Sequence, residues 1–177
     1  MIIFHEFKKT SNKNLIFYFS TNYQGLNITT AGTYYVALAL KVNSLYEQGC
    51  IKPINITLSY DAGPSNNCSY QLQFHSTYGS IGSTTGTLTY GTLSYSIGQS
   101  LVGDGTQTLT SDGYVLSSGS LNSQNSINLS SNDFELLLPR AICTRYNSTL
   151  FDTLFLFATS STNNAQVFAS IDFIELI

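Results

Sequence analysis

Histidine and cysteine are the side chains best suited to nucleophilic or metal chemistry, and both are scarce in this chain. The 177 residues include two histidines, His5 and His75, and three cysteines, Cys50, Cys68 and Cys143. No cysteine pair has CxxC spacing, and no HExxH, GxSxG, phosphate-binding or dinucleotide-binding motif occurs. Cys50 and Cys68 flank a predicted hairpin and could form a disulfide; the alternative is three buried thiols. We therefore expect no catalytic residues, no metal and no cofactor.

Carboxylates offer a second route to chemistry, because two acids opposed across a cleft can hydrolyse a glycosidic bond. The sequence places no two of its carboxylates together, so a hydrolase is the weaker alternative. Asp104 and Asp112 each precede a glycine in "DGTQTLTSDG", where clustered oxygen ligands could bind calcium. Two hairpin turns flanking the strand "TQTLT" explain this spacing better.

Tyrosine is the aromatic residue that could bind a ligand. The chain has 12 Tyr, 11 Phe and no Trp. Sugars stack their CH faces on aromatic rings, and four tyrosines occur in a Gly- and Thr-rich region: Tyr78, Tyr90, Tyr95 and Tyr114. These four are the candidate glycan-binding residues. The alternative for them is cross-strand packing on a sheet.

Charged residues make up only 10% of the chain, where about 25% is typical, and the net charge is −3. Lys8, Lys9 and Lys13 form a short basic run, but nucleic-acid binding needs a basic stripe that displaces counterions from phosphates. No stretch reaches the roughly 18 apolar residues of a spanning helix. We expect neither nucleic-acid binding nor membrane insertion. A neutral surface of hydroxyls and amides favours contact with copies of itself or with glycans.

Strand-like runs recur along the chain, and helical periodicity is nearly absent. Turn clusters such as "NYQG", "DAGPSNN" and "VGDG" separate them. Strands are predicted near residues 2–7, 14–20, 33–43, 54–60, 69–76, 86–97, 106–116, 133–138, 152–159 and 165–176. Many short strands without βαβ alternation predict an all-β fold, an antiparallel jelly-roll β-sandwich. We expect one domain over residues 1–177, in which residues 1–13 could form an N-terminal strand or arm.

The stretch "GTYYVALALKVNS", residues 32–44, has large residues at its even positions from Tyr34 to Leu40. These should fill the core, while the small Ala37 and Ala39 on the reverse face leave room for a loop, an arm or a neighbouring subunit. The alternative is a plain strand whose outer face is thinly covered. The runs "TLFLFATSS" and "VFASIDFIELI" carry apolar residues on both faces. Such runs are interior strands or strands at a subunit contact.

Residues 76–131 are rich in Ser, Thr and Gly and carry almost no charge. We expect long hairpins or loops here, presented at one end or side of the sandwich. Such segments are the usual places for contact with partners.

The stretch "LNITTAGTYYVALALKVNS" resembles a segment common in jelly-roll sandwiches, and "VFASIDFIELI" resembles a closing strand of such domains. Two groups share these features. One comprises carbohydrate-binding modules and the C-terminal sandwich of insecticidal crystal toxins, although the toxin pattern has an Arg-rich first strand where this chain reads "YYVALALKV". The other comprises trimeric heads of complement and tumour-necrosis-factor type and similar viral or phage spike heads. The resemblance implies a jelly roll at an outer surface.

The first residues, "MIIFHEFKKTSNKN", place apolar residues before lysines, the reverse of a secretory leader. The composition is nevertheless typical of proteins found outside the cell. The chain would then be outside because a leader was removed, because it is excised from a longer protein, or because cell lysis releases it. We expect a non-enzymatic structural subunit of a virion or other extracellular assembly that self-associates. The alternative is a lectin-like module that binds glycans.

Overall fold

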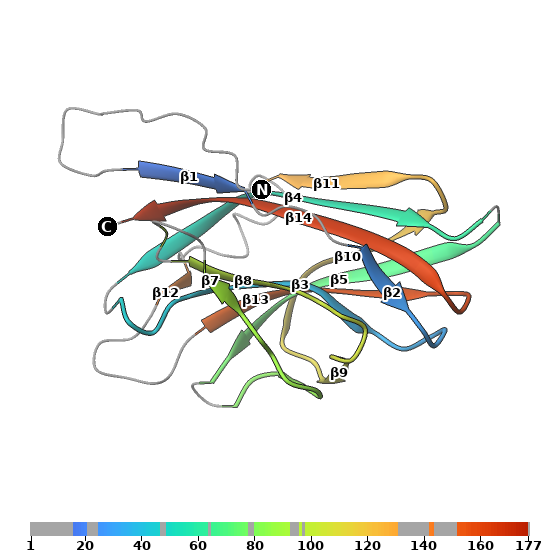
Figure 1. The fold of residues 1–177 in the computed structure, drawn as a ribbon, viewed down its shortest axis with the longest axis horizontal. Coiled ribbons are helices and arrows are strands. Elements are labelled where there is room, and N and C mark those ends of the chain that lie inside the picture. The colour runs from blue at the N-terminus through green and yellow to red at the C-terminus, as the bar shows by residue number, and fades with distance from the viewer. Residues whose placement is uncertain are drawn as a thin grey trace.

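The computed structural model describes residues 16–20, 25–46, 49–63, 65–77, 80–92, 96, 98–130, 142–143 and 152–176. Within these ranges the ordered elements are strands (Figure 1): β1 (Ile16–Ser20), β2 (Gly25–Ile28), β3 (Tyr35–Val42), β4 (Cys50–Asp61), β5 (Asn67–Ser76), β6 (Ser83–Thr84), β7 (Gly91–Thr92), β8 (Gly98–Val102), β9 (Leu109–Ser111), β10 (Tyr114–Asn122), β11 (Ser126–Ser130), β12 (Ile142–Cys143), β13 (Asp152–Ser160) and β14 (Ala165–Leu176). The described part contains no helix of the length and apolarity needed to cross a membrane.

The strands form two antiparallel sheets in jelly-roll order. One sheet runs β2-β14-β4-β11, and the other contains β3, β13, β5 and β10 in that order. Of these eight strands in chain order, the first, eighth, third and sixth therefore share one sheet, and the second, seventh, fourth and fifth share the other. This arrangement is that of a jelly roll. The predicted all-β antiparallel sandwich is confirmed.

Two further pairings extend these sheets. β1 continues the edge formed by β2 along β14, and β12 pairs with β4. In the second sheet, β8 adds to β3 and β7 adds to β8. The two-faced apolar strands predicted near residues 152–159 and 165–176 are interior strands, because β13 lies between β3 and β5 and β14 lies between β2 and β4.

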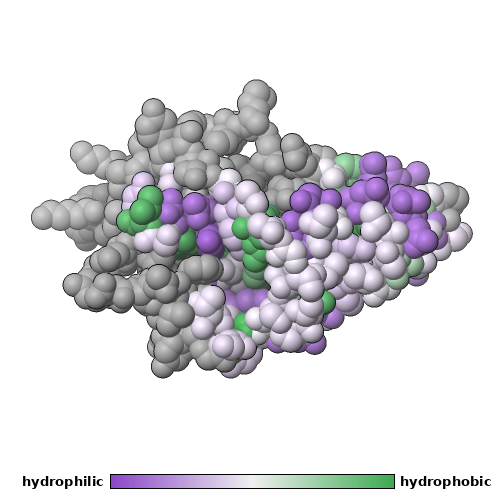
Figure 2. Space-filling model, turned by 60° about the horizontal axis from the view of Figure 1, so that its bottom comes forward, coloured by the Kyte–Doolittle hydropathy of each residue, from purple (hydrophilic) through white to green (hydrophobic). Residues whose placement is uncertain are grey.

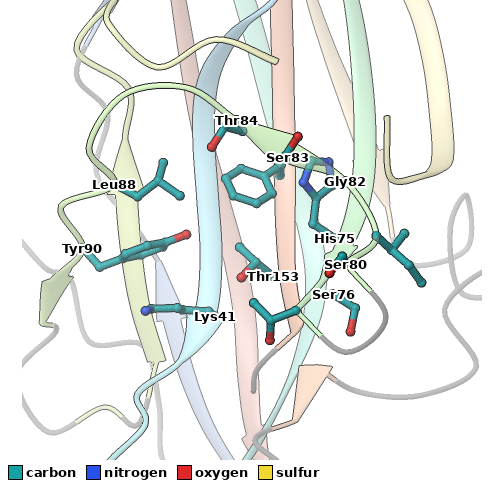
Figure 3. A pocket seen from close by; sticks show the side chains of 13 residues that line it. Lys41, His75, Ser76, Ser80, Gly82, Ser83, Thr84, Leu88, Tyr90 and Thr153 are labelled. Atoms are coloured by element: carbon teal, nitrogen blue, oxygen red, sulfur yellow. The ribbon is translucent and has the colours of Figure 1, made fainter. Parts of the chain in front are cut away.

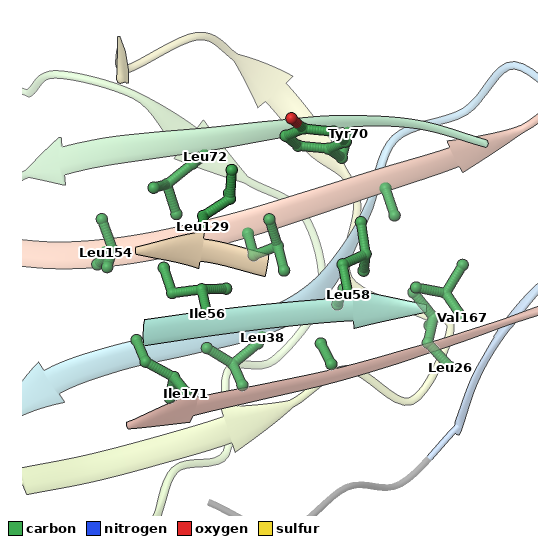
Figure 4. Packing of buried hydrophobic residues seen from close by; sticks show 14 of the residues in the cluster. Leu26, Leu38, Ile56, Leu58, Tyr70, Leu72, Leu129, Leu154, Val167 and Ile171 are labelled. Atoms are coloured by element: carbon green, nitrogen blue, oxygen red, sulfur yellow. The ribbon is translucent and has the colours of Figure 1, made fainter. Parts of the chain in front are cut away.

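The main core lies between the two sheets (Figure 4). Ile56 and Leu58 of β4 and Ile171 of β14 belong to the first sheet and are fully buried. Leu38 of β3 and Leu154 of β13 belong to the second sheet and lie in the same cluster. Burying one such side chain contributes about 1.5–3 kcal/mol, so this cluster provides most of the apolar stabilisation.

Several strand predictions need correction. β2 and β11 were not predicted, because their sequences "GLNI" and "SINLS" are short and polar. Of the described residues in the strand predicted near 86–97, Gly91 and Thr92 are strand (β7), and the strand predicted near 106–116 is divided between β9 and the start of β10. The strands predicted near 2–7 and 133–138, and the proposed arm over residues 1–13, lie outside the described residues.

Candidate functional site

Residues 77–113, here called the inserted segment, connect β5 to β10 and contain β6 to β9. β7 and β8 extend the second sheet beside β3, whereas Leu88, Tyr90 and Leu109 of the segment pack against a hydrophobic cluster of that sheet that is separate from the main core. Backbone hydrogen bonds attach the segment to β3: Val36 N–H donates to the Gln107 carbonyl at 3.0 Å, and Leu109 N–H donates to the Tyr34 carbonyl at 2.9 Å. Of the Ser-, Thr- and Gly-rich region 76–131, the inserted segment therefore covers one side of the sandwich, whereas β10 and β11 are strands of the sandwich itself and not loops presented at its side.

A second hydrophobic cluster, the outer cluster, lies between this segment and the sheet. It contains Val36, Ala39, Leu101, Phe155 and Phe157, all buried. Leu88, Tyr90 and Leu109 of the inserted segment pack against the cluster that contains the small Ala39. A loop, an arm and a neighbouring subunit were the occupants considered for the Ala39 face, and the structure places a loop there.

The face predicted for Val36 is wrong. Leu38 pairs with Leu156, but Val36 pairs with Phe157, so Ala37 is an extra residue in β3 and forms a β-bulge. The bulge reverses the alternation: Ala37 joins the main core and Val36 joins the outer cluster. Tyr34 also packs against the outer cluster instead of the core.

A cleft of about 520 Å³ opens beside the outer cluster (Figure 3). The row Lys41, Thr153 and His75, which are neighbours across β3, β13 and β5, crosses the cleft from one wall to the other. Phe155 lies two residues farther along β13 and also lines it. The remaining lining comes from β5 and the inserted segment: Ser76, Thr77, Ser80, Ile81, Gly82, Ser83, Thr84, Leu88 and Tyr90.

Lys41 and Tyr90 form one wall of the cleft. The Lys41 Nζ lies 4.1 Å from the centroid of the Tyr90 ring, a cation–π contact. Burial lowers the pKa of Lys41 and raises the pKa of Tyr90, and the neighbouring Thr153 hydroxyl opposes part of the rise at Tyr90. The Tyr90 hydroxyl is fully buried and has no hydrogen-bond partner of acceptable geometry among the described residues.

His75 forms the opposite wall and is held neutral. Gln73 Nε2 donates to Gln71 Oε1 at 2.6 Å and to Asp112 Oδ1 at 2.9 Å, so Gln73 Oε1 accepts from His75 Nε2–H at 2.8 Å. The imidazole also packs on the Phe155 ring, with centroids 4.7 Å apart. Burial lowers the pKa of His75 to about 4, against the opposing effect of Asp112. At neutral pH this ring is therefore an uncharged packing group.

The structure places the four candidate tyrosines differently. Tyr90 is half-buried and lines the cleft, and its ring lies beneath the Lys41 ammonium group. Tyr114 is 60% exposed at the start of β10 and does not line the cleft. Tyr78 and Tyr95 lie outside the described residues. Sequence reasoning missed Lys41, Thr153 and Phe155, and the available signal was that Lys41 is the only charged residue in "GTYYVALALKVNS".

The two aspartates considered for calcium accept hydrogen bonds from protein groups, Asp104 within its own turn and Asp112 from β5. Asp104 Oδ1 accepts from the Thr106 N–H at 2.9 Å and from the Thr106 hydroxyl at 2.6 Å, and these bonds lower the pKa of Asp104. Asp112 Oδ1 accepts from the Gln73 side chain. In the described ranges, no three His, Cys, Asp or Glu side chains gather in a way that could hold a metal ion.

The cysteines follow neither alternative drawn from the sequence. Cys50 is disulfide-bonded, whereas Cys68 is a free, buried thiol, so a Cys50–Cys68 bridge is excluded. In the backbone register, β12 places residue Cys143 opposite Cys50 of β4. Burial raises the pKa of Cys68 to about 12, so this thiol is not a nucleophile at neutral pH.

Comparison with known proteins adds little to this geometry. No family model matches the chain, and no curated protein matches it. Among solved structures, one of Desmodium yellow mottle tymovirus is similar over 96% of this chain and 90% of that chain, with 14% sequence identity and a TM-score of 0.36. A likeness at this level carries no argument about function, which has to be argued from the chain itself.

Proposed function

We propose that this protein is a non-enzymatic structural subunit of a virion or other extracellular assembly and that it associates with copies of itself. One observation carries the proposal: the jelly roll ends at a long, uncharged edge strand, β10. Jelly rolls recur in capsid and lectin domains, and an unpaired strand edge is a ready site for another strand.

The edge strand β10 lacks the features that usually prevent strand addition. Its sequence "YVLSSGSLN" contains no Lys, no Pro and no charged residue. Within the described residues it pairs with β5 alone, and Tyr114 and Val115 are 60% and 48% exposed. A bulge interrupts the ladder between Val115 and Ser117, after which the register is regular to Asn122. The regular part, residues 117–122, is the stretch suited to pairing with a second copy.

The molecular surface is also suited to close contact between copies. Figure 2 shows one face on which the described residues are mostly of intermediate hydropathy, with small hydrophobic patches. With only 10% charged residues, like-charge repulsion between copies is weak. Such a surface supports association without a single large apolar patch.

Light scattering coupled to size-exclusion chromatography, followed by negative-stain microscopy, tests the proposal. The full chain should form oligomers, filaments or shells whose population grows with concentration. Ser118→Lys places a charge on the exposed part of β10 and should shift the protein towards monomer. Thr30→Lys adds the same charge at an exposed position outside β10 and should leave assembly unchanged. A strict monomer at high concentration would contradict the proposal.

The cleft favours a second candidate function, a lectin-like module that binds glycans. Its volume lies within the range of small-molecule sites, and it combines aromatic and aliphatic surface with several hydroxyl groups. Tyr114 remains a candidate stacking surface at the sheet edge, separate from the cleft. Titration of free monosaccharides against the full chain, followed by NMR, tests this candidate. Absence of any chemical-shift change at cleft residues would remove it.

A further inference from the structure

The edge strand β10 presents a stretch of small, uncharged residues around a glycine. Ser118, Gly119 and Ser120 are exposed and lie in the regular part of the ladder with β5. Ser118 pairs with Gln71, which in turn pairs with Phe157 of the outer cluster, so Ser118 and Ser120 lie on the outer face of the second sheet. Because no residue of β10 is charged, a second strand can approach this stretch closely.

A tyrosine hydroxyl reaches the same edge from the core. Tyr70 of β5 is 4% exposed, its ring packs in the main core (Figure 4), and it pairs with Gly119. A Cβ at Gly119 would lie 2.7 Å from the Tyr70 hydroxyl oxygen, so the hydroxyl lies where the glycine has no side chain. In the described part of the chain this hydroxyl has no hydrogen-bond partner, and its oxygen is not fully enclosed. A phenol both donates and accepts, so a group on a second chain can satisfy it.

Symmetry restricts how two β10 strands can pair. Copies that meet through the same edge and keep their outer faces on one side are related by a two-fold axis perpendicular to the sheet, which makes the strands antiparallel. Opposite residues then share a face. An axis at Gly119 places the two glycines opposite each other and places Ser118 opposite Ser120 of the second copy. The space beside the two glycines then takes both Tyr70 hydroxyls, one as donor and the other as acceptor.

From these observations we propose that two copies pair antiparallel through β10 about a two-fold axis at Gly119, and that their Tyr70 hydroxyls form a hydrogen bond across the axis. The second sheets of the two copies then form one continuous sheet. This inference rests on the proposed self-association and specifies its first step, a closed dimer. Because a two-fold contact closes on itself, any larger assembly uses a further surface.

Cysteine variants test the register on the full chain. Ser118→Cys and Ser120→Cys change the side chains little and place thiols at exposed positions. A mixture of the two variants, one of them isotope-labelled, is treated with a thiol crosslinker whose reach is about 5 Å, the separation of opposite Cβ atoms. Mass spectrometry should find crosslinks mainly between residue 118 of one copy and residue 120 of the other. Thr30→Cys, at an exposed position outside β10, should not crosslink.

The crosslinks separate this inference from the proposed function. Predominant crosslinking of Ser118→Cys or of Ser120→Cys with itself would show another register and overturn the inference. Oligomers that give no crosslink from β10 would also overturn it, but would leave self-association intact. A strict monomer would remove both the inference and the proposed self-association.

Removal of the hydroxyl tests the contact across the axis. Tyr70→Phe should raise the dissociation constant of the dimer about threefold or more, because the bond between the copies is lost. Tyr35→Phe is the matched control, because the Tyr35 hydroxyl is 2.9 Å from the Thr29 hydroxyl within the chain, and it should leave the dissociation constant unchanged. Analytical ultracentrifugation measures both variants. An unchanged dissociation constant for a folded Tyr70→Phe variant would overturn the hydroxyl contact, and the crosslinks decide the register independently.

Discussion

Val36 and Leu38 lie two positions apart on β3, yet their side chains pack into different hydrophobic clusters. Leu38 faces the main core between the sheets, and Val36 faces the inserted segment. The β-bulge at Ala37 causes this, because one extra residue reverses the alternation of all residues before it. β3 is therefore buried on both faces, one by the second layer of the sandwich and one by residues 77–113.

Truncation of Leu38 tests how much the packing of the main core contributes to the free energy of unfolding. Leu38→Ala should lower the free energy of unfolding by about 2–5 kcal/mol, because the side chain is 1% exposed and its removal leaves a cavity. Leu45→Ala is the control, because Leu45 is 84% exposed. This variant should change the free energy of unfolding by no more than about 0.5 kcal/mol. Urea denaturation measures both. A loss below about 1 kcal/mol for Leu38→Ala would place that face outside the core.

Gly103 marks the closest approach of the inserted segment to β3. A Cβ at this position would lie 1.6 Å from the Val36 carbonyl oxygen, and that oxygen belongs to the backbone. Gly103→Ala should therefore destabilise the protein by about 3 kcal/mol or more, because the segment must move away from the sheet. A Cβ at Gly91 would have the Ser100 carbonyl oxygen at 3.6 Å, an ordinary contact, so Gly91→Ala should cost about 1 kcal/mol or less. Similar melting temperatures for the two variants would contradict this packing.

The fold was predictable from alternation where strands are long and apolar, as in β13 and β14. β2 and β11 were missed because each presents only one or two apolar side chains to the core: Leu26 and Ile28 in the first, Leu129 in the second. The bulge at Ala37 was not predictable, because it is defined by the pairing with β13 and leaves no mark in the alternation of β3 itself.

The cleft was predictable only in part. Tyr90 was singled out from its Gly- and Thr-rich surroundings, and it does line the cleft. Lys41, Thr153 and His75 come from three strands far apart in the sequence and become neighbours only through the β3–β13–β5 register. No local motif encodes that register, so the lining of the cleft could not be derived from residue spacing.

Removal of two buried tyrosine hydroxyl groups, those of Tyr60 and Tyr90, should change the free energy of unfolding differently. The Tyr60 hydroxyl is 2.7 Å from the Ser160 hydroxyl in a buried hydrogen bond, so Tyr60→Phe should cost about 0.5–1.5 kcal/mol. The Tyr90 hydroxyl is buried without a well-formed partner in the described part, so Tyr90→Phe should be neutral or stabilise by up to about 1 kcal/mol. Urea denaturation of the two variants gives the comparison. An equal loss in both would mean that the Tyr90 hydroxyl is satisfied in solution.

Cys68 should be unreactive in the native protein. The thiol is fully buried, and burial raises its pKa to about 12, so almost no thiolate exists at neutral pH. Iodoacetamide without reductant should label Cys68 only after unfolding in guanidinium, and peptide mass spectrometry identifies the site. Rapid labelling of the native chain at Cys68 would show that the β5–β13 region opens readily.

His75 should make the stability fall as the pH is lowered below neutral. Its pKa is about 4 in the folded protein, against an ordinary value of 6.5, so between these values the unfolded chain binds more protons than the folded one. The stability that this neutral histidine preserves is complete above about pH 7, is lost as the pH falls towards 4, and changes no further below that. From about pH 7 to about pH 5.5, where most carboxylates stay ionised, the loss should be about 1 kcal/mol. His75→Asn is the comparison, because it lacks the titrating group, and its urea midpoint should vary less over this range. Parallel pH profiles for wild type and variant would assign the titration to groups other than His75.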